Sequence, residues 1–309
     1  MRILGYIGTY NEAIDLPLGA LQRQTCPLDE ILVVDNASSR GSPRGPLPAQ
    51  VTLIRNRENL GPSGAIETGL QYAMEHNYDW IWIFDADSAP HDDALEKLVS
   101  LYGSLEPNAQ RQIGILGCSK ILVPSGQVFL GRLLTPGGPR KPKIVPGRPY
   151  CECDVTIWSG SLFKIDAVRE VGMPRHGRNG YWEDLGHDYG DVEFSHRIRR
   201  AGYRVLIHRE SLVDQLVGES KEMEILGLKL LSTNHPPGRR YLYFRNLLYF
   251  WLYLYPRRRP IRFTLWFSYR FSVTLLKILI MEDDQTSKMA ASFRGVWHGI
   301  RKKMDQVYV

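Results

Sequence analysis

The 309-residue chain has few cysteines, and their spacing excludes two kinds of site. None of the four forms a CxxC pair, so neither a zinc ribbon nor a thioredoxin-like redox motif is expected; they are Cys26, Cys118, Cys151 and Cys153. Cys151 and Cys153 are too close in sequence for an easy disulfide. Free thiols in a reducing cytosol are therefore expected.

Long uncharged apolar runs and a signal-peptide pattern are also missing. No stretch reaches the roughly 18 uncharged apolar residues of a membrane span, and the chain begins with a strand-like run at residues 3–7. We therefore expect a cytoplasmic protein without a membrane-spanning segment. With 43% hydrophobic and 23% charged residues, the composition is that of a globular protein. The net charge of +6 suits nucleic acid, anionic lipid or a phosphorylated substrate.

Apolar runs alternate with helical patterns through the first half of the chain. The runs at residues 3–7, 31–34, 51–54, 80–84 and 113–116 predict buried strands. Helices are predicted at residues 13–23, 62–76 and 92–105. Such alternation predicts an α/β fold with a mostly parallel sheet, in which ligands bind beyond the carboxyl ends of the strands.

Two carboxylates follow the fourth apolar run directly. Asp85 and Asp87 are one residue apart, so in an extended chain both point the same way. Such a pair suits a divalent cation with oxygen ligands, and a cation of this kind often accompanies a substrate phosphate. An Asp-rich turn before the next helix is the plainer alternative.

Polar residues also follow the first two strands. They are Thr9, Tyr10, Asn11, Asp35 and Asn36, and we expect them to share one crevice with the carboxylate pair. An Asx turn through residues 35–38 is the alternative for Asp35. Gly61 follows Asn59 at a helix entry, but its spacing is not GxGxxG, which argues against a dinucleotide site.

In this order, segments 9–11, 34–38, 59–61 and 85–87 resemble the family 2 glycosyltransferases. Segments 159–162, 188–193 and 201–203, with Arg197, extend the resemblance to the rhamnosyltransferase-like subgroup. The resemblance implies an inverting enzyme with a GT-A fold, a Rossmann-like sheet that binds a nucleotide-diphosphate sugar. It would move rhamnosyl, galactofuranosyl or another hexosyl to a hydroxyl of a glycan or lipid-linked acceptor, in cell-surface polysaccharide synthesis.

The resemblance also assigns roles. It implies that the nucleotide is bound by Thr9, Tyr10, Asn11, Asp35, Asn36, Asn59, Gly61 and Asp85. Asp87 with Asp85 would hold Mg²⁺ or Mn²⁺, and Gln215 stands where the subgroup often has a histidine, as a weaker neutral ligand. Asp191 matches the general base, with Asp184 as the alternative, and Glu193 would help to bind the acceptor. Trp158, Ser159 and Gly160 would lie on the acceptor side.

We expect a catalytic domain at residues 1–235 and a helical extension at residues 236–309. Residues 132–149, rich in proline, glycine and basic residues, are interpreted as a loop, either a lid or a solvated connection. The extension combines clustered arginines with tryptophan and tyrosine, which favours a peripheral position on the inner face of the membrane. Packing on the catalytic domain, or against a second subunit in a homo-oligomer, would explain the same pattern.

The acids argue against a nucleic-acid partner. Asp35, Asp85, Asp87 and Asp191, all expected at strand or helix ends, would repel a phosphate backbone unless a metal intervened. Two other functions remain open at this point, a non-catalytic nucleotide-sugar-binding protein and a sugar nucleotidyltransferase.

Overall fold

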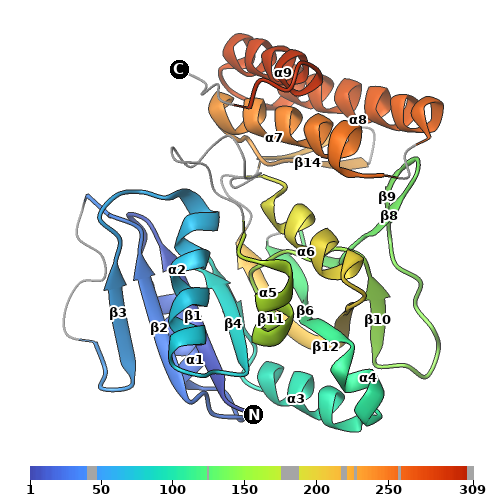
Figure 1. The fold of residues 1–309 in the computed structure, drawn as a ribbon. Helices are drawn as coiled ribbons and strands as arrows, with labels where there is room; N and C mark the ends of the chain where they lie inside the picture. Colours follow the sequence, from blue (N-terminus) through green and yellow to red (C-terminus); the bar gives the residue numbers. More distant parts are fainter. Residues whose placement is uncertain are drawn as a thin grey trace.

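The computed structural model describes residues 1–39, 47–123, 125–174, 188–216, 221–225, 228–256 and 259–304. Its main element is a ten-stranded mixed sheet flanked by helices (Figure 1). The strand order is β10 (Tyr150–Cys153), β12 (Arg204–Leu216), β6 (Ile113–Val123), β11 (Ser161–Lys164), β4 (Trp80–Asp85), β1 (Ile3–Thr9), β2 (Glu30–Asp35) and β3 (Val51–Arg55). Short β5 (Ser88–Pro90) pairs with β12, and β7 (Gln127–Phe129) pairs with β6.

The five predicted strands are confirmed as β1, β2, β3, β4 and β6. β1 runs parallel to β2 and β4, and β2 runs parallel to β3, so their carboxyl ends share one edge. β6 and β12 form a second parallel pair, which antiparallel β11 joins to β4. The fold is therefore α/β with a mainly parallel N-terminal half.

Alternate residues of the central strands fill two hydrophobic cores, one on each face of the sheet. Leu4 and Tyr6 of β1 belong to the core that includes α2 (Gly61–Glu75), α5 (Ile165–Val171) and α6 (Gly190–Arg200). Ile3 and Ile7 belong to the core that includes α1 (Asp15–Gln22) and α3 (Ala94–Ser104). A short helix, α4 (Pro107–Arg111), leads into β6. The period of two along β1 thus places helices on both faces.

Three C-terminal helices lie together at one end of the molecule (Figure 1). They are α7 (Pro237–Tyr249), which continues as the π-helix η1 (Phe250–Leu254), α8 (Pro260–Met281) and α9 (Gln285–Ile300). α7 and α9 touch through backbone: a Cβ on Gly295 would lie 2.4 Å from the carbonyl oxygen of Tyr241. The sequence analysis expected a helical extension here without placing α9 as a separate helix, and it did not predict the hairpin β13 (Lys221–Ile225) and β14 (Leu228–Ser232). The predicted boundary at residue 235 stays a prediction.

Two expectations need correction. The loop expected at residues 132–149 contains a hairpin, β8 (Leu133–Thr135) and β9 (Gly138–Arg140), which packs on α8 where Gly138, at φ +115°, meets the Trp266 ring. High proline and glycine content hides these short strands. The search for a membrane span also needs correction, because α8 is long and apolar enough to cross a membrane by length and composition alone, while the expected peripheral position stays a prediction. Arg270 and Lys277 interrupt its apolar run, which is why a search for uncharged stretches missed it.

Candidate active site

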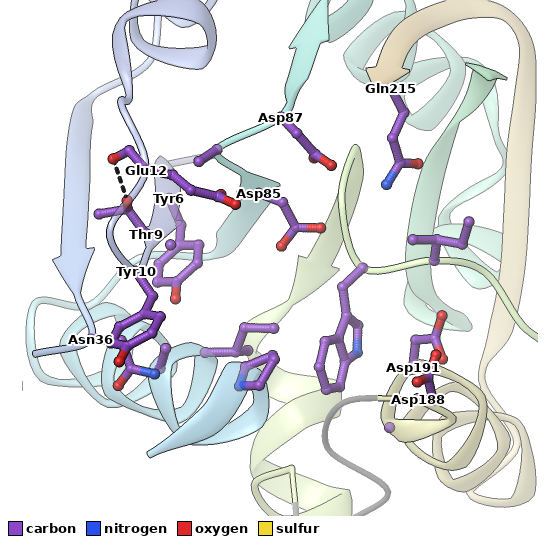
Figure 2. A pocket seen from close by; sticks show the side chains of 18 of the residues that line it. Tyr6, Thr9, Tyr10, Glu12, Asn36, Asp85, Asp87, Asp188, Asp191 and Gln215 are labelled. Atoms are coloured by element: carbon purple, nitrogen blue, oxygen red, sulfur yellow. Dashed lines mark hydrogen bonds between the residues drawn. The ribbon is translucent and has the colours of Figure 1, made fainter. Parts of the chain in front are cut away.

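A cavity of about 520 Å³ opens beyond the carboxyl ends of β1, β2 and β4 (Figure 2). One side is built from those strand ends and the start of α2, and the other from the segment before α6, the first turn of α6 and the end of β12. This is the position expected for ligands in an open α/β sheet. The cavity therefore joins segments that are far apart in the sequence.

Many of the residues predicted for the site line this one cavity. They are Thr9, Tyr10, Asn36, Asn59, Asp85, Asp87, Trp158, Asp191 and Gln215. Strand pairing explains part of the convergence, because Thr9 lies opposite Asp35 at the ends of β1 and β2, and Gly8 lies opposite Asp85. The roles assigned to these residues stay predictions.

Asp85, Asp87 and Gln215 offer oxygen atoms to the same part of the cavity (Figure 2). Burial and the neighbouring Asp87 raise the pKa of Asp85 to about 7, and burial also raises the pKa of Asp87. Pairing of β12 with β5 places Gln215 opposite Ser88, next to Asp87. The Gln215 Oε1 atom is buried and has no hydrogen-bond partner among the described residues. Two crowded carboxylates and an unpartnered amide oxygen fit a hard divalent cation.

The described residues hold no cluster of three or more His, Cys, Asp or Glu side chains suited to a metal. A cation bound here would therefore take only two charged ligands from the described part of the protein, with a neutral amide as the third. Oxygen atoms of a substrate or of water would have to complete its coordination.

Asp191 lies in the first turn of α6, on the opposite side of the cavity from Asp85 (Figure 2). Its Oδ1 accepts a hydrogen bond of 2.8 Å from the Val192 backbone N–H. Burial raises the pKa of Asp191 to about 6, although this hydrogen bond opposes the shift. The carboxyl group thus lines the cavity and has a raised pKa, two properties that a general base near neutral pH requires.

The turn before α6 has an unusual backbone. Tyr189 has φ +80°, a left-handed conformation that is costly for a bulky residue. Its ring is held against Tyr243 and Phe250, with centroids 6.1 and 5.8 Å away. Packing against α7 and η1 therefore stabilises the turn that presents Asp191 to the cavity.

The lining residues that were given no role in the sequence analysis include Tyr6, Glu12, Asp188 and Arg239. The Tyr6 hydroxyl is buried without a hydrogen-bond partner in the described structure, so a ligand can supply one. Burial raises the pKa of Asp188 to about 7. Asp188 lies in segment 188–193, so the resemblance could have indicated it. Tyr6 is hard to recognise because it alternates with core residues along a strand, and Arg239 is hard to recognise because it lies far along the chain from the other site residues.

A hydrogen-bond network supports the side of the cavity lined by Asn36 and Asn59. The Asn36 Nδ2 group donates to Asn59 Oδ1 at 2.7 Å and to the Gly61 carbonyl at 3.1 Å. The Gly61 N–H donates to Asn59 Oδ1 at 2.9 Å, and Gly61 has φ +71°, which favours glycine. Gly61 thus shapes the entry of α2 without lining the cavity itself.

Asp35 and Asn11 lie behind the lining residues. Asp35 Oδ1 accepts from the Ser38 N–H at 2.9 Å, so the turn considered as an alternative for this residue is present. Asp35 Oδ2 is buried and lies 3.4 Å from Arg55 Nε. Asn11 Oδ1 accepts from the Ser39 N–H at 2.9 Å. For both residues the structure records support of loops, and a contact with nucleotide stays a prediction.

The other predicted residues that the structure describes do not line this cavity. Ser159 Oγ accepts from the Asp85 N–H at 3.2 Å, and Gly160 bonds to Ile83 in β4, so both position the carboxylate strand. Glu193 faces a second cavity and lies 2.7 Å from Arg197 Nε. Asp184, the alternative base, lies outside the described residues.

Comparison with known proteins gives a family match for part of the chain and relatives that align with most of it. Residues 6–119 match the model of glycosyl transferase family 2. The chain is 26% identical over 232 residues to an undecaprenyl-phosphate mannosyltransferase of Micrococcus luteus, covering 72% of this chain and 87% of that protein. It is 28% identical over 260 residues to a dTDP-rhamnosyl transferase of Shigella flexneri, RfbF, covering 79% and 78%.

A solved structure also shares the fold. It is that of GalNAc-T7 with UDP, GalNAc and Mn²⁺, with a TM-score of 0.56 and 13% sequence identity. The match covers 81% of this chain and 47% of the GalNAc-T7 chain, so this chain spans about half the length of that protein. At this identity the likeness shows a GT-A-like fold alone.

Proposed function

We propose that this chain, which carries a family 2 glycosyltransferase domain, transfers a sugar from a nucleotide-diphosphate donor to an acceptor hydroxyl with inversion. One observation supports this most: Asp191 faces Asp85 and Asp87 across a single cavity (Figure 2). An inverting transfer needs a base on one side of the anomeric carbon and charge compensation for the leaving diphosphate on the other.

In the proposed reaction Asp191 accepts the proton of the acceptor hydroxyl. The oxygen then forms a bond to the anomeric carbon while the bond from that carbon to the diphosphate oxygen breaks. The electron pair of that bond leaves with the nucleoside diphosphate. Tyr10, Asn36 and Asn59 line the side of the cavity where the nucleotide would bind.

Asp85, Asp87 and Gln215 would hold a divalent cation, Mg²⁺ or Mn²⁺. When bound, it supplies positive charge to the diphosphate. The structure of GalNAc-T7, which has a similar fold, contains Mn²⁺ and UDP, and this supports a cation and a nucleotide as ligands of this protein.

For the donor sugar, rhamnosyl is the first candidate because of the subgroup resemblance and the relative RfbF. Galactofuranosyl or another hexosyl follows. A glycan or lipid-linked acceptor in cell-surface polysaccharide synthesis is supported by the relative that is named for undecaprenyl phosphate.

The outer surface of α8 supports a position at the inner face of the cell membrane. Ile261, Leu265, Tyr269 and Leu276 are 78%, 67%, 71% and 56% exposed, and they lie along one face of the helix. Next to them, Arg140, Arg259 and Arg262 line a hollow of about 260 Å³. An apolar face beside clustered arginines suits a helix that lies in the interface of an anionic membrane. Because α8 also packs on α9, β9 and the β13–β14 hairpin, we favour this over a membrane span.

The proposed function is tested by a screen of nucleotide sugars. dTDP-rhamnose, UDP-galactofuranose and UDP-hexoses are incubated with the protein and Mg²⁺, and released nucleoside diphosphate is measured. We expect release with one donor class, and a loss after EDTA treatment that Mg²⁺ or Mn²⁺ restores. Binding without release would indicate a non-catalytic sugar-nucleotide protein, and release of pyrophosphate a nucleotidyltransferase.

Asp191→Asn tests the base in the same assay. The substitution keeps size and hydrogen bonding but removes the proton acceptor, so we expect transfer to fall by at least about 10²-fold while nucleotide binding persists. Asp166→Asn, at an exposed position of α5, is the matched control and should keep full activity. Normal turnover by Asp191→Asn would move the assignment to Asp184.

A further inference from the structure

The cavity has an uneven balance of charge. Its carboxylates belong to Glu12, Asp85, Asp87, Asp188 and Asp191. Among the described residues that line it, Arg239 is the only lysine or arginine. A nucleoside diphosphate would bring further negative charge into this space, so every fixed cation there has a strong influence on binding.

Arg239 belongs to α7, in the C-terminal extension, and reaches the cavity from outside the strands. Its Nε lies 3.5 Å from Asp188 Oδ2, longer than a charge-assisted hydrogen bond of about 2.7–2.9 Å. Its side chain is 47% exposed, and the described residues offer it no other ion pair. The guanidinium is thus held near the cavity by a loose contact, with most of its donors unused.

Arg240, the next residue of α7, has a structural role and contrasts with Arg239. Arg240 is buried, and its guanidinium pairs with Glu282, which also lies close to Lys288. These contacts fasten α7 to the start of α9. Arg239 has no such network among the described residues and lines the cavity instead.

The position of α7 relative to the cavity is fixed by contacts near Arg239. Asn246 Nδ2 donates to the Asp188 carbonyl oxygen at 2.9 Å. Buried Arg245 donates to the Met304 carbonyl oxygen at 3.0 Å. The backbone that carries Arg239 is therefore tied both to the cavity wall and to the end of α9.

We propose that Arg239 moves from Asp188 to the donor diphosphate and stabilises the negative charge that develops on the leaving group. The inference rests on the proposed function, since it needs a diphosphate leaving group. A guanidinium suits this task because its planar fork of N–H groups matches phosphate oxygens. Asp188 then serves to hold the guanidinium near the cavity before the donor binds.

Calorimetric binding of UDP, dTDP and GDP, each compared with its monophosphate, tests the inference in the full-length protein with Mg²⁺. The wild type should prefer the diphosphate of one base. In Arg239→Gln this preference should fall by about 10- to 100-fold, with monophosphate affinity unchanged. Arg239→Lys should recover part of it, because charge returns without the fork. Transfer by Arg239→Gln should fall by about 10²–10³-fold.

Arg169→Gln is the matched control. Arg169 is 48% exposed and also lies 3.5 Å from an aspartate, Asp166, but it is remote from the cavity lining. An unchanged diphosphate preference in Arg239→Gln would overturn this inference and leave the proposed function standing. A wild type that prefers the diphosphate but transfers no sugar would overturn the proposed function and, with it, the role of Arg239 at a leaving group. Equal weakening of monophosphate and diphosphate binding would show a structural role and would also overturn it.

Discussion

Buried carboxyl groups are the chemical feature that sets this cavity apart. Burial raises the pKa values of Asp85, Asp188 and Asp191 to about 7, 7 and 6. Ionising each of them inside the protein has a cost that a proton, a cation or a guanidinium can relieve. In the metal-free protein, this part of the fold should therefore be sensitive to pH.

Asp188 gives a testable case. Its folded pKa of about 7 exceeds the ordinary value of 3.8, so its contribution to stability is present below pH 3.8 and is lost as pH rises through 7. Asp188→Asn removes this loss. Relative to the wild type, the variant should gain on the order of 1–3 kcal/mol in unfolding free energy between pH 5 and pH 8.

Urea unfolding in EDTA at pH 5 and pH 8 measures this gain, and Asp166→Asn is the exposed control. A difference between Asp188→Asn and the wild type that is the same at both pH values would show that Asp188 is ionised throughout. The burial argument would then be wrong for this residue.

The sequence predicted the positions of some site residues and not of others. Asp85 and Asp87 were placed correctly at a strand end, because a buried apolar run followed by polar residues marks that edge locally. Tyr6 and Arg239 could not be placed, because their access to the cavity depends on how α2 and α7 pack. Glu193 was expected near the acceptor but faces a different cavity, since two residues along a helix turn a side chain by about 200°.

At the level of elements, the junction between β4 and β11 positions the strand that ends at Asp85. Gly160 precedes β11, has φ +72°, and a Cβ there would lie 2.9 Å from Val213 Cγ2. Its N–H donates to the Ile83 carbonyl oxygen at 2.7 Å. The glycine therefore lets β11, β4 and β12 approach one another behind Asp85.

Gly160→Ala should destabilise the protein by about 1–3 kcal/mol, because it adds backbone strain and a close contact. Gly103→Ala is the contrasting control. A Cβ at Gly103 in α3 meets nothing within 4 Å, so alanine should raise stability by up to about 1 kcal/mol. Chemical denaturation of both variants measures the two effects. Equal stability of Gly160→Ala and the wild type would show that Val213 and the strand can adjust freely.

Long periodic elements were predicted well and short ones were not. α2 and the parallel strands have patterns that burial reinforces, so their positions were predicted to within a few residues. β8 and β9 have three residues each, and their pairing is set by packing on α8 rather than by local sequence. α9 is polar on one side and contains two glycines. The glycines allow α9 to approach α7 closely, but their low helix propensity makes the helix harder to predict from sequence.

At the scale of the whole molecule, the apolar face of α8 and the neighbouring arginines lie at the end that holds α7–α9 (Figure 1). We expect the protein to float with vesicles rich in phosphatidylglycerol and to remain unbound with neutral vesicles. Arg259→Glu with Arg262→Glu should weaken binding, because each basic residue near an anionic surface adds about 1 kcal/mol. Arg111→Glu, on α4 at the far end, is the control and should bind normally.

Loss of flotation in high salt would support the electrostatic part of this binding. If the wild type fails to float at low salt, the face of α8 belongs to another partner, and a second subunit is the first to examine. Sedimentation of the protein without lipid would then show whether it forms a homo-oligomer.

The position of α7 also has a consequence for synthesis of the protein. A ribosome exposes the strands bearing Asp85 and Asp87, and later Asp191, before α7 has left its exit tunnel. Such a nascent chain lacks the guanidinium that we assign to the diphosphate. An unfinished polypeptide would thus lack part of the cavity, and sugar transfer would begin only after the last helices had docked.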